Sequence, residues 1–444
     1  MNKYTGLLAS STIFFISSLV NFFARFLTSI IIARALGAEG KGLYVLTLTT
    51  GALLVLLLDI GISVSVVYLT ANRRYQTGEI FIYTSWISLS LGLLGGSLFF
   101  LLYTNYLANT IFSGVDPSYM LIMLIFLPIH LLTSVQASIL LGLQRVFAYN
   151  LVGITRSISI LALQIGSVIL HEGVLGAILA WCLGNLLAFL LTLWLLRKDI
   201  NFRFTHQRSI VKDSLSYGVK GYLANLIAFF NLRLDSFILN YYSTPMFVGL
   251  YSTGVSSAEL IWNVPDSISS ALFPKSAASD RLNSSRLTAQ ACRNTLFLMI
   301  VLSITFGLTG IWLIPWVFGS EFQASVIPFL LLLPGIVAIT ITKLINANLS
   351  GIGLPQYAAY TSAIVLAATI TLDIVLIPPY RIAGAAIASS ISYLLSAVLS
   401  LYWFRKETQI GWKETIVPKG QDFIYLGRRA YQLLCEFSST YLTR

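Results

Sequence analysis

Charged side chains are scarce in this chain of 444 residues. Asp, Glu, Lys and Arg together make up 10% of it, whereas a soluble domain has roughly 25%. So little charge excludes an ordinary soluble globular enzyme. The high apolar content also excludes a disordered chain, because disorder requires low hydrophobicity and high charge.

Cysteine and histidine are also rare, with three of each. Cys182, Cys292 and Cys435 stand far apart and form no CxxC or other metal-like spacing. This pattern excludes a disulfide-rich secreted module. It also gives no reason to expect zinc or another metal, so we expect no metal site and no cofactor.

Apolar residues are abundant instead, at 57% of the chain, and the mean hydropathy is +0.82. Since one spanning helix takes ~20 apolar residues, the chain has room for about twelve spans with their loops. We therefore predict an all-α, polytopic protein of the plasma or inner membrane, whose first apolar run is a retained span rather than a signal peptide. The predicted spans are 8–33, 42–69, 79–103, 118–141, 149–170, 174–196, 214–240, 247–273, 291–314, 324–347, 356–377 and 383–404.

Basic residues are distributed unevenly between the loops. Of 28 Lys and Arg residues, 21 fall in the N-terminus, the even-numbered loops (Lys343 among them) and the tail. Only Arg34, Lys41 and Arg381 fall in the odd-numbered loops. The positive-inside rule therefore places both termini in the cytoplasm. Topology and attraction to anionic lipids explain the net charge of +11, so we do not expect nucleic acid as a partner.

The two halves of the chain resemble each other through short motifs that recur at an offset of 207 or 208 residues. The pairs are Gly42-Leu43-Tyr44 with Gly249-Leu250-Tyr251, Asp59 with Asp266, Arg25 with Arg233, and Gly176-Ala177 with Gly384-Ala385. Six spans per half form a parallel repeat, because each half then enters the membrane from the same side. Two such bundles are typical of alternating-access transporters, the alternative being a duplication that only stabilises the fold.

The repeat and the charge pattern divide the chain into four segments. They are an N-terminal six-helix lobe (1–196), a cytoplasmic linker (197–213), a C-terminal six-helix lobe (214–404) and a basic cytoplasmic tail (405–444). The tail places apolar residues on one helical face, which predicts an amphipathic helix on the inner leaflet. That face consists of Phe423, Leu426, Ala430, Leu433, Leu434, Phe437 and Tyr441.

Polar residues follow helical spacing along several predicted spans. The first span carries Ser18, Asn21, Arg25 and Thr28; the seventh carries Lys220, Tyr222, Asn225, Asn231, Arg233 and Asp235; the eighth carries Ser252, Ser256, Glu259, Asn263, Asp266 and Ser270. A charge at mid-bilayer costs roughly 2.5–3.5 kcal/mol on insertion scales. We therefore expect these side chains to face one another or water, in a chamber shared by the two halves.

The residue types suggest what the chamber binds. Guanidinium groups hold phosphate oxygens bidentately, so the basic and amide residues are candidates for an anionic group such as pyrophosphate. These candidates are Arg25, Arg233, Lys220, Asn21 and Asn225, with a snorkelling lysine as the alternative for Lys220. The acids Asp59, Asp235, Glu259 and Asp266 would either pair with the cations or carry a coupling H⁺ or Na⁺.

Two further ionisable residues lie in predicted spans. His130 follows Pro128 in the middle of the fourth span. We expect a hydrogen-bonded core histidine there, with a proton carrier as the alternative. Asp373 lies near the outer end of its span, and we expect it to be solvated.

Several segments resemble one known family. Residues 32–44 read IARALGAEGKGLY, which is similar to a signature of the oligosaccharide flippases of the MOP superfamily. These are the Wzx-type polysaccharide transporters, relatives of MATE drug exporters and of lipid II flippases. Residues 57–61 (LLDIG) resemble the end of that family's second span, and 234–235, 248–251 and 273–274 resemble its second-half pattern. The resemblance extends over nearly the whole chain.

The resemblance implies a function. A polyprenyl-pyrophosphate-linked oligosaccharide would be moved from the cytoplasmic to the outer leaflet, for surface polysaccharide or O-antigen biosynthesis, with coupling to an ion gradient. Candidate partners are the membrane lipids and a polysaccharide polymerase or glycosyltransferases. Lipid II flippases have functional arginines in the first span, and Arg25 is the residue that matches here. They also have more spans than the twelve predicted here, which argues against lipid II as the substrate.

Two other classes of function stay open. A MATE-like, cation-coupled multidrug antiporter would have an acidic, aromatic cavity. The acids within the predicted spans are compatible with such a cavity, so this alternative stays open. A membrane enzyme such as a polymerase, ligase or glycosyltransferase needs catalytic groups on a sizeable outer loop, and the predicted outer loops are short. We therefore predict a transporter and not an enzyme.

Overall fold

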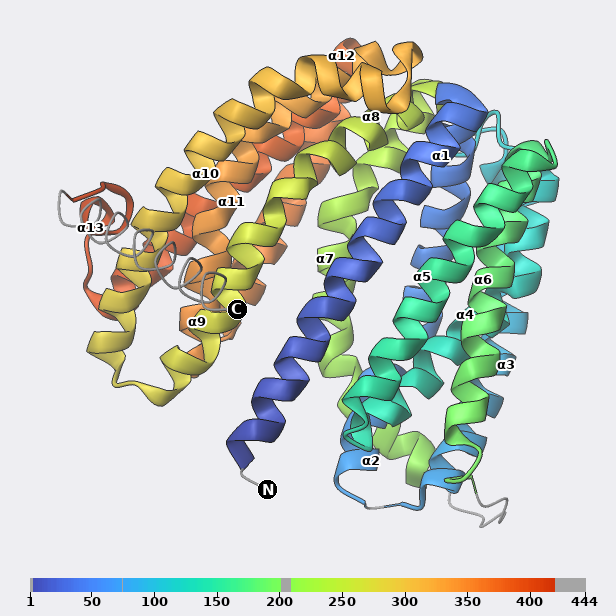
Figure 1. Cartoon of the computed structure of the whole chain (residues 1–444), viewed down its shortest axis with the longest axis horizontal. Helices are drawn as coiled ribbons and strands as arrows, with labels where there is room; N and C mark the ends of the chain where they lie inside the picture. The colour runs from blue at the N-terminus through green and yellow to red at the C-terminus, as the bar shows by residue number, and fades with distance from the viewer. Residues whose placement is uncertain (1–2, 74, 201–208, 420–444) are drawn as a thin grey trace, which may run out of the picture. The chain divides into compact units, whose positions relative to one another are not determined.

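The computed structural model describes residues 3–73, 75–200 and 209–419, with side chains from residue 16 in the first range and from residue 222 in the last. Every regular element in these ranges is helical (Figure 1). Among them, nine helices are long and apolar enough to cross a membrane. The prediction of an all-α, multi-pass protein of the cell membrane is therefore confirmed, while the predicted tail helix lies largely outside the described residues.

The helices follow one another with short connections. The first half contains α1 (Lys3–Asp59), α2 (Ile62–Ala71), α3 (Thr77–Leu102), the π-helical turn η1 (Tyr103–Leu107), α4 (Pro117–Gly142), α5 (Val146–Ile169) and α6 (Gly173–Leu196). The second half contains α7 (Ser209–Tyr242), α8 (Pro245–Ala258), η2 (Glu259–Trp262), α9 (Asn263–Ala278), α10 (Arg281–Phe318), η3 (Ser320–Ser325), α11 (Val326–Gly351), α12 (Gln356–Thr408) and α13 (Trp412–Ile416).

Helix α1 contains two membrane spans joined by a sharp reversal. The backbone leaves the helical region at Gly37, where φ is 67°. Beyond this residue, the Lys41 ammonium donates to the Ser29 hydroxyl at 3.0 Å. In a straight helix these two residues would stand about 18 Å apart. The chain therefore turns back on itself at Gly37, and the second arm of α1 runs beside the first.

Helix α12 reverses in the same way at Arg381, where φ is 48°. The Thr369 hydroxyl donates to the Ser392 hydroxyl at 2.8 Å, although a straight helix would separate these residues by about 35 Å. With both reversals counted, and with α8, η2 and α9 taken together as one interrupted span, the described helices correspond to the twelve predicted spans.

The second predicted span, 42–69, was expected to be continuous and is instead broken. Ile60 and Gly61 both have positive φ, and they separate the end of α1 from the start of α2. At this bend the backbone lies directly against α7. A Cβ added at Gly61 would be only 2.2 Å from the carbonyl oxygen of Gly218. The eighth predicted span is also interrupted, by the 3₁₀ turn η2.

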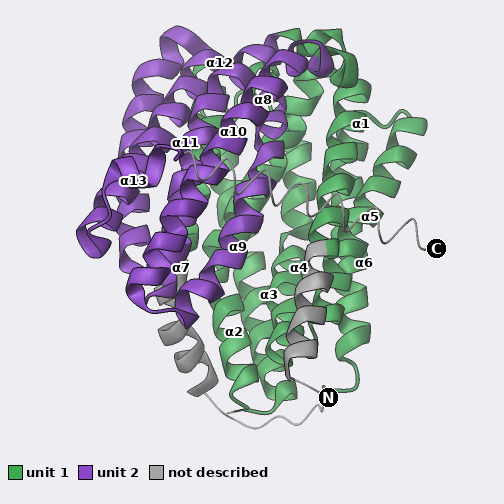
Figure 2. Cartoon of the chain, turned by 60° about the vertical axis from the view of Figure 1, so that its left-hand side comes forward, with its two compact units in different colours: residues 1–252, 315–323 green, residues 253–314, 324–444 purple. Residues whose placement is uncertain are grey.

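The chain forms two compact units (Figure 2). The first comprises residues 1–252 and 315–323, and the second comprises 253–314 and 324–444. Each has its own apolar core, built in the first unit around Ile62 and Ile139 and in the second around Leu344 and Phe404. The described part of α7 packs with the first unit, whereas the predicted lobe boundary falls before it, so the division into two six-helix lobes stays a prediction.

Within the first unit, the connections alternate between two ends. The Arg145 guanidinium forms a bidentate ion pair with Asp199, at 2.7 and 2.8 Å, and thereby joins the α4–α5 connection to the end of α6. A surface pocket lined by Arg73 and Gln144 joins the α2–α3 and α4–α5 connections at the same end. The even-numbered connections of this unit therefore lie together, as alternating spans require. The placement of this end in the cytoplasm stays a prediction.

The repeated Gly-Leu-Tyr motif marks a close helix contact in the first unit. A Cβ added at Gly42 of α1 would lie 1.7 Å from the carbonyl oxygen of Pro245. A Cβ added at Gly249 of α8 would lie 1.9 Å from the carbonyl oxygen of Ala38. Both backbones approach so closely that only hydrogen fits at these two positions.

We predict that Gly42→Ala lowers the stability of the protein by about 1–3 kcal/mol, the usual cost of forcing extra atoms into a packed contact. Thermal unfolding of the detergent-purified protein measures this effect. Gly166→Ala in α5 is the matched control, because nothing lies within 4 Å of an added Cβ there. Equal unfolding temperatures for the two variants would contradict the contact.

Candidate functional site

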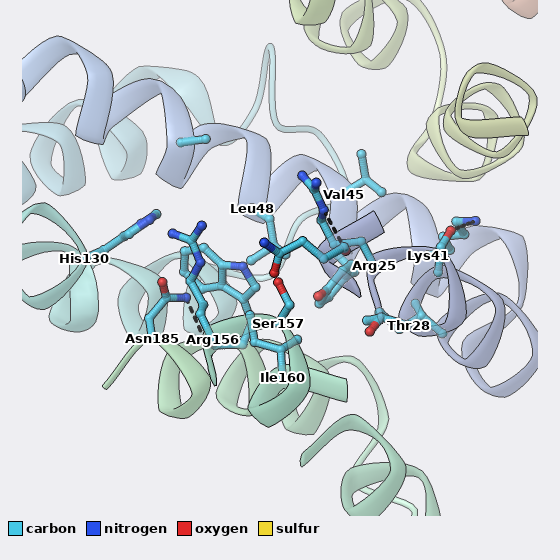
Figure 3. A pocket seen from close by; sticks show the side chains of 16 residues that line it. Arg25, Thr28, Lys41, Val45, Leu48, His130, Arg156, Ser157, Ile160 and Asn185 are labelled. Atoms are coloured by element: carbon cyan, nitrogen blue, oxygen red, sulfur yellow. Dashed lines mark hydrogen bonds between the residues drawn. The ribbon is translucent and has the colours of Figure 1, made fainter. Parts of the chain in front are cut away.

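The first unit contains a cavity of about 500 Å³ lined by residues of α1, α4, α5 and α6 (Figure 3). Its lining consists of Asn21, Arg25, Thr28, Ser29, Ile32, Lys41, Tyr44, Val45, Leu48, Ala52, His130, Arg156, Ser157, Ile160, Trp181 and Asn185. Both arms of α1 contribute, because the reversal at Gly37 returns residues 41–52 to the face that carries Asn21 and Arg25. The helical spacing of Asn21, Arg25, Thr28 and Ile32 places them along one face of the first arm.

The polar lining lies deep within the helices. Arg25 is twelve residues before the turn at Gly37, which corresponds to about 18 Å along the helix axis. Arg156 is ten residues into α5 and Asn185 twelve residues into α6, or about 15 and 18 Å from the respective helix starts. Since the hydrocarbon core of a bilayer is about 30 Å thick, these side chains lie near its middle.

Two arginines dominate the electrostatics of the cavity. The Arg25 Nε donates to the carbonyl oxygen of Asn21 at 3.1 Å, which orients the rest of its guanidinium. Arg156 projects from α5, and Figure 3 shows both guanidinium groups directed into the same space. Arg25 is exposed to this space, and so is Arg156. None of the sixteen lining residues is acidic, and no described ion pair involves either arginine.

Lys41 adds a third cation at another part of the cavity. Its side chain is only 3% exposed, and its ammonium lies 4.7 and 5.4 Å from the ring centres of Phe318 and Phe322. Together with the Ser29 hydroxyl, these rings stabilise the charge through cation–π attraction and one hydrogen bond. Within the described residues, Lys41 has no carboxylate partner. The sequence predicted a reversal between residues 33 and 42 and counted Lys41 in that loop. The turn lies at Gly37 instead, so Lys41 already belongs to the second arm of α1, on the cavity side.

An aromatic and amide wall faces the arginines. The Asn185 side-chain nitrogen donates to the carbonyl oxygen of Trp181 at 2.9 Å. The His130 ring meets the Trp181 ring edge to face, with 4.9 Å between centres. His130 was expected to be a hydrogen-bonded core histidine. It instead lines the cavity, and its Nδ1 makes no hydrogen bond to any described group.

The structure brings together only some of the predicted binding residues. Arg25 and Asn21 line the cavity, whereas Arg233 and Asn225 lie on α7 and are not among its lining residues. Arg233 is half-buried and Asn225 is exposed. The side chain of Lys220 lies outside the described residues. A role for these three in binding therefore stays a prediction.

None of the four predicted acids lines the cavity, and three of them have partners elsewhere. Asp59 accepts from the Ser63 hydroxyl at 2.7 Å, and Asp235, 7% exposed, accepts from the Tyr251 hydroxyl at 2.5 Å. Asp266 pairs with the Lys343 ammonium at 2.6 Å. Glu259 is half-buried in η2. For Asp266 the ion pair favours charge pairing over ion coupling.

Two expectations about depth were wrong. Lys343 was counted with the cytoplasmic loops, but it lies inside α11, where its ammonium is also 4.3 Å from the Trp262 ring centre. Asp373 was expected to be solvated and is fully buried in α12, at 0% exposure. Both side chains are turned toward neighbouring helices. The direction in which a side chain points cannot be deduced from its position along a single helix.

Arg156 is the main residue that the sequence reasoning left without a role. It lies within the predicted span 149–170. The criterion that singled out Arg25, an ionised group at mid-span, applies equally to Arg156. Trp181 and Asn185 gave no such signal, because one indole and one amide in an apolar helix are compatible with ordinary packing.

We predict that Tyr251→Phe lowers stability by about 1–3 kcal/mol, because the buried carboxylate of Asp235 then loses a hydrogen-bond donor. Thermal unfolding of the purified protein measures the loss. Tyr106→Phe is the control, since Tyr106 is 70% exposed. An unchanged unfolding temperature for Tyr251→Phe would indicate that Asp235 does not depend on this bond.

Comparison with known proteins identifies one family over more than half of the chain. A sequence model of the family described as "Polysaccharide biosynthesis protein" matches residues 7–280, a range that includes every residue of the cavity lining.

Two curated relatives come from Haloferax volcanii. One is named "Probable low-salt glycan biosynthesis flippase Agl15" and is 23% identical over 220 residues, covering 47% of this chain and 46% of the relative. The other is named "Probable flippase AglR" and is 26% identical over 239 residues, covering 51% and 48%. The chain thus spans about half the length of the curated relatives it matches.

Two solved structures share the fold over most of their length. An inward-facing multidrug resistance MATE family transporter of the MOP superfamily superposes with a TM-score of 0.75 at 17% identity, covering 88% of this chain and 94% of that one. The lipid II flippase MurJ, in an inward closed conformation, gives a TM-score of 0.70 at 15% identity, covering 98% and 100%. At these identities the likeness shows the fold alone.

Proposed function

Because this chain belongs to the polysaccharide biosynthesis protein family, we propose that it is a flippase for a lipid-linked oligosaccharide. Its cargo would be a sugar chain joined through pyrophosphate to a polyprenyl lipid. The protein would carry the polar part of this molecule from the cytoplasmic to the outer leaflet, for surface polysaccharide biosynthesis. It would act as a transporter rather than as a catalyst.

The observation that carries this proposal is the excess of positive charge in the cavity. Arg25, Arg156 and Lys41 line it, and none of the described lining residues is acidic. A charge near the middle of a bilayer costs roughly 2.5–3.5 kcal/mol on insertion scales. Arg25 and Arg156 are two such charges, and they are retained most readily when an anionic ligand compensates them during part of the working cycle.

Pyrophosphate fits this charge pattern. Each guanidinium can donate two parallel hydrogen bonds to phosphate oxygens, and these charge-assisted bonds are roughly twice as strong as neutral ones. Two arginines that face one space can therefore hold a pyrophosphate from two sides. Holding it lowers the free energy of moving its negative charge through the membrane.

The same observation disfavours the multidrug antiporter. An organic cation would be repelled by a cavity with three basic residues and no carboxylate. The fold does not separate the two functions, since both a drug transporter and a lipid flippase share it. The names of the two Haloferax volcanii relatives support the flippase.

The mechanism we propose is alternating access, and its support comes from the internal repeat in the sequence. Coupling to H⁺ or Na⁺ stays a prediction, with Asp59, Asp235, Glu259 and Asp266 as its candidate residues. A polysaccharide polymerase or glycosyltransferases would act on the cargo before or after translocation and are proposed as partners.

We predict that Arg25→Ala and Arg156→Ala each reduce surface polysaccharide at least about tenfold, because each removes a phosphate-binding guanidinium worth more than 1.4 kcal/mol. The assay is complementation of a strain that lacks its own flippase, with the amount of protein in the membrane measured in parallel. Arg286→Ala is the control, since Arg286 is exposed and does not line the cavity. Wild-type polymer levels in both cavity variants would contradict the proposal.

A second prediction addresses binding directly. Farnesyl pyrophosphate should bind the purified protein, and both arginine variants should weaken this binding at least about tenfold. Farnesol, which lacks the pyrophosphate, should bind equally weakly to wild type and variants. Displacement of a fluorescent prenyl pyrophosphate measures both. Equal affinity of wild-type protein for the two ligands would exclude pyrophosphate recognition.

A further inference from the structure

Three polar atoms of the cavity have no part in holding pyrophosphate. They are the side-chain oxygens of Asn21 and Asn185 and the Nδ1 of His130. All three are buried, and none has a hydrogen-bond partner among the described groups. Buried polar atoms are nearly always hydrogen-bonded in proteins. Other buried side-chain atoms of the described residues also have no partner, but these three line one cavity. Their partners can therefore come from what the cavity binds.

Two of these atoms have fixed orientations. The Asn185 side chain is 2% exposed, and its nitrogen donates to the carbonyl oxygen of Trp181, so its oxygen must be the free atom. The His130 ring is held edge to face against the Trp181 ring. A ligand therefore meets a preformed pair of sites on one wall.

The three groups come from three different helices. Asn21 belongs to α1, His130 to α4 and Asn185 to α6. Figure 3 shows His130 and Asn185 on the side of the cavity where Arg156 lies, with Lys41 at the opposite side. His130 and Asn185 thus lie beside an arginine that the proposed function assigns to the pyrophosphate.

We propose that Asn21, Asn185 and His130 bind the hydroxyl groups of the first sugar, the one attached directly to the pyrophosphate. This inference rests on the proposed function and extends it to the glycan. Amide oxygens accept hydrogen bonds from hydroxyl groups, and a neutral imidazole nitrogen can do the same. A sugar carries several hydroxyls close to its pyrophosphate, so both parts of the cargo fit within one cavity.

The other parts of the cargo do not match these atoms. A polyprenyl chain has no hydrogen-bond donors and would leave all three buried atoms without partners, which is unfavourable. Phosphate oxygens are acceptors and would not pair with amide oxygens. The chemistry therefore orients the cargo, with its sugar toward His130 and Asn185 and its lipid elsewhere.

The test uses three probes that share a farnesyl pyrophosphate end. The first is farnesyl pyrophosphate itself, the second its glucosyl ester, and the third its cyclohexyl ester. The glucosyl and cyclohexyl probes have rings of the same size, but only the glucosyl ring has hydroxyls. Their affinities for the detergent-purified, full-length protein are measured by displacement of a fluorescent prenyl pyrophosphate.

We expect wild-type protein to bind the glucosyl probe about tenfold more tightly than the cyclohexyl probe, the ratio that a few net hydrogen bonds provide. Asn185→Ala should remove most of this preference while leaving the affinity for farnesyl pyrophosphate within about twofold of wild type. His130→Phe should act in the same way. It keeps a ring against Trp181, so it tests the nitrogen even if Asn185→Ala fails to fold.

Two results would overturn the inference. One is equal affinity of wild-type protein for the glucosyl and cyclohexyl probes. The other is an equal loss for all three probes in the Asn and His variants, which would mean that these residues only support the structure. Failure of the proposed function looks different, because wild-type protein would then bind none of the probes, or Arg25→Ala would bind all of them unchanged.

Discussion

The free-energy cost of an ionised side chain inside a hydrocarbon layer constrains this protein more than any other interaction. The chain has few charges, and several of them lie near the middle of membrane helices, where each costs several kcal/mol unless it meets water or a partner. Among the acids in the helices, Asp59 and Asp235 accept from hydroxyl groups, and Asp266 pairs with Lys343. The guanidinium groups of Arg25 and Arg156 instead face an open cavity. This difference between paired acids and unpaired cations gives the cavity its chemical character.

The backbone of the first unit is shaped to build that cavity. The turn at Gly37 requires glycine for two reasons. Its φ is positive, and a Cβ there would lie 2.7 Å from the Glu321 carboxylate. The same carboxylate accepts from the backbone nitrogen of Ala38, and the Arg34 guanidinium donates to the carbonyl oxygen of Val317 at 2.7 Å. Residues 315–323 therefore fix the turn. This turn places Lys41 beside the face of α1 that carries Arg25. The position of the third cation therefore depends on the turn at Gly37.

Much of the fold could be predicted from the sequence, because hydropathy and charge record how each segment meets the membrane. Helix spacing also identified Asn21 and Arg25 as members of one polar face. What the sequence could not give is which helix each residue faces. The depths of Lys343 and Asp373, the return of Lys41 onto the cavity and the break at Ile60 all depend on contacts between segments far apart in the chain. Arg156 differs from these, since the mid-span criterion would have identified it.

The fold itself does not determine the cargo. A drug transporter and a lipid flippase share this architecture at 17% and 15% identity, so the choice between an organic cation and an anionic lipid must lie in the side chains that line the path. In this chain the lining carries basic and amide groups, while carboxylates are absent from the described lining and are satisfied elsewhere. An electrostatic potential of one sign favours ligands of the other sign over the whole cavity, whereas hydrogen-bond acceptors act only at contact distance. Charge therefore selects the class of cargo, and the fixed amide and imidazole atoms are left to distinguish among its members.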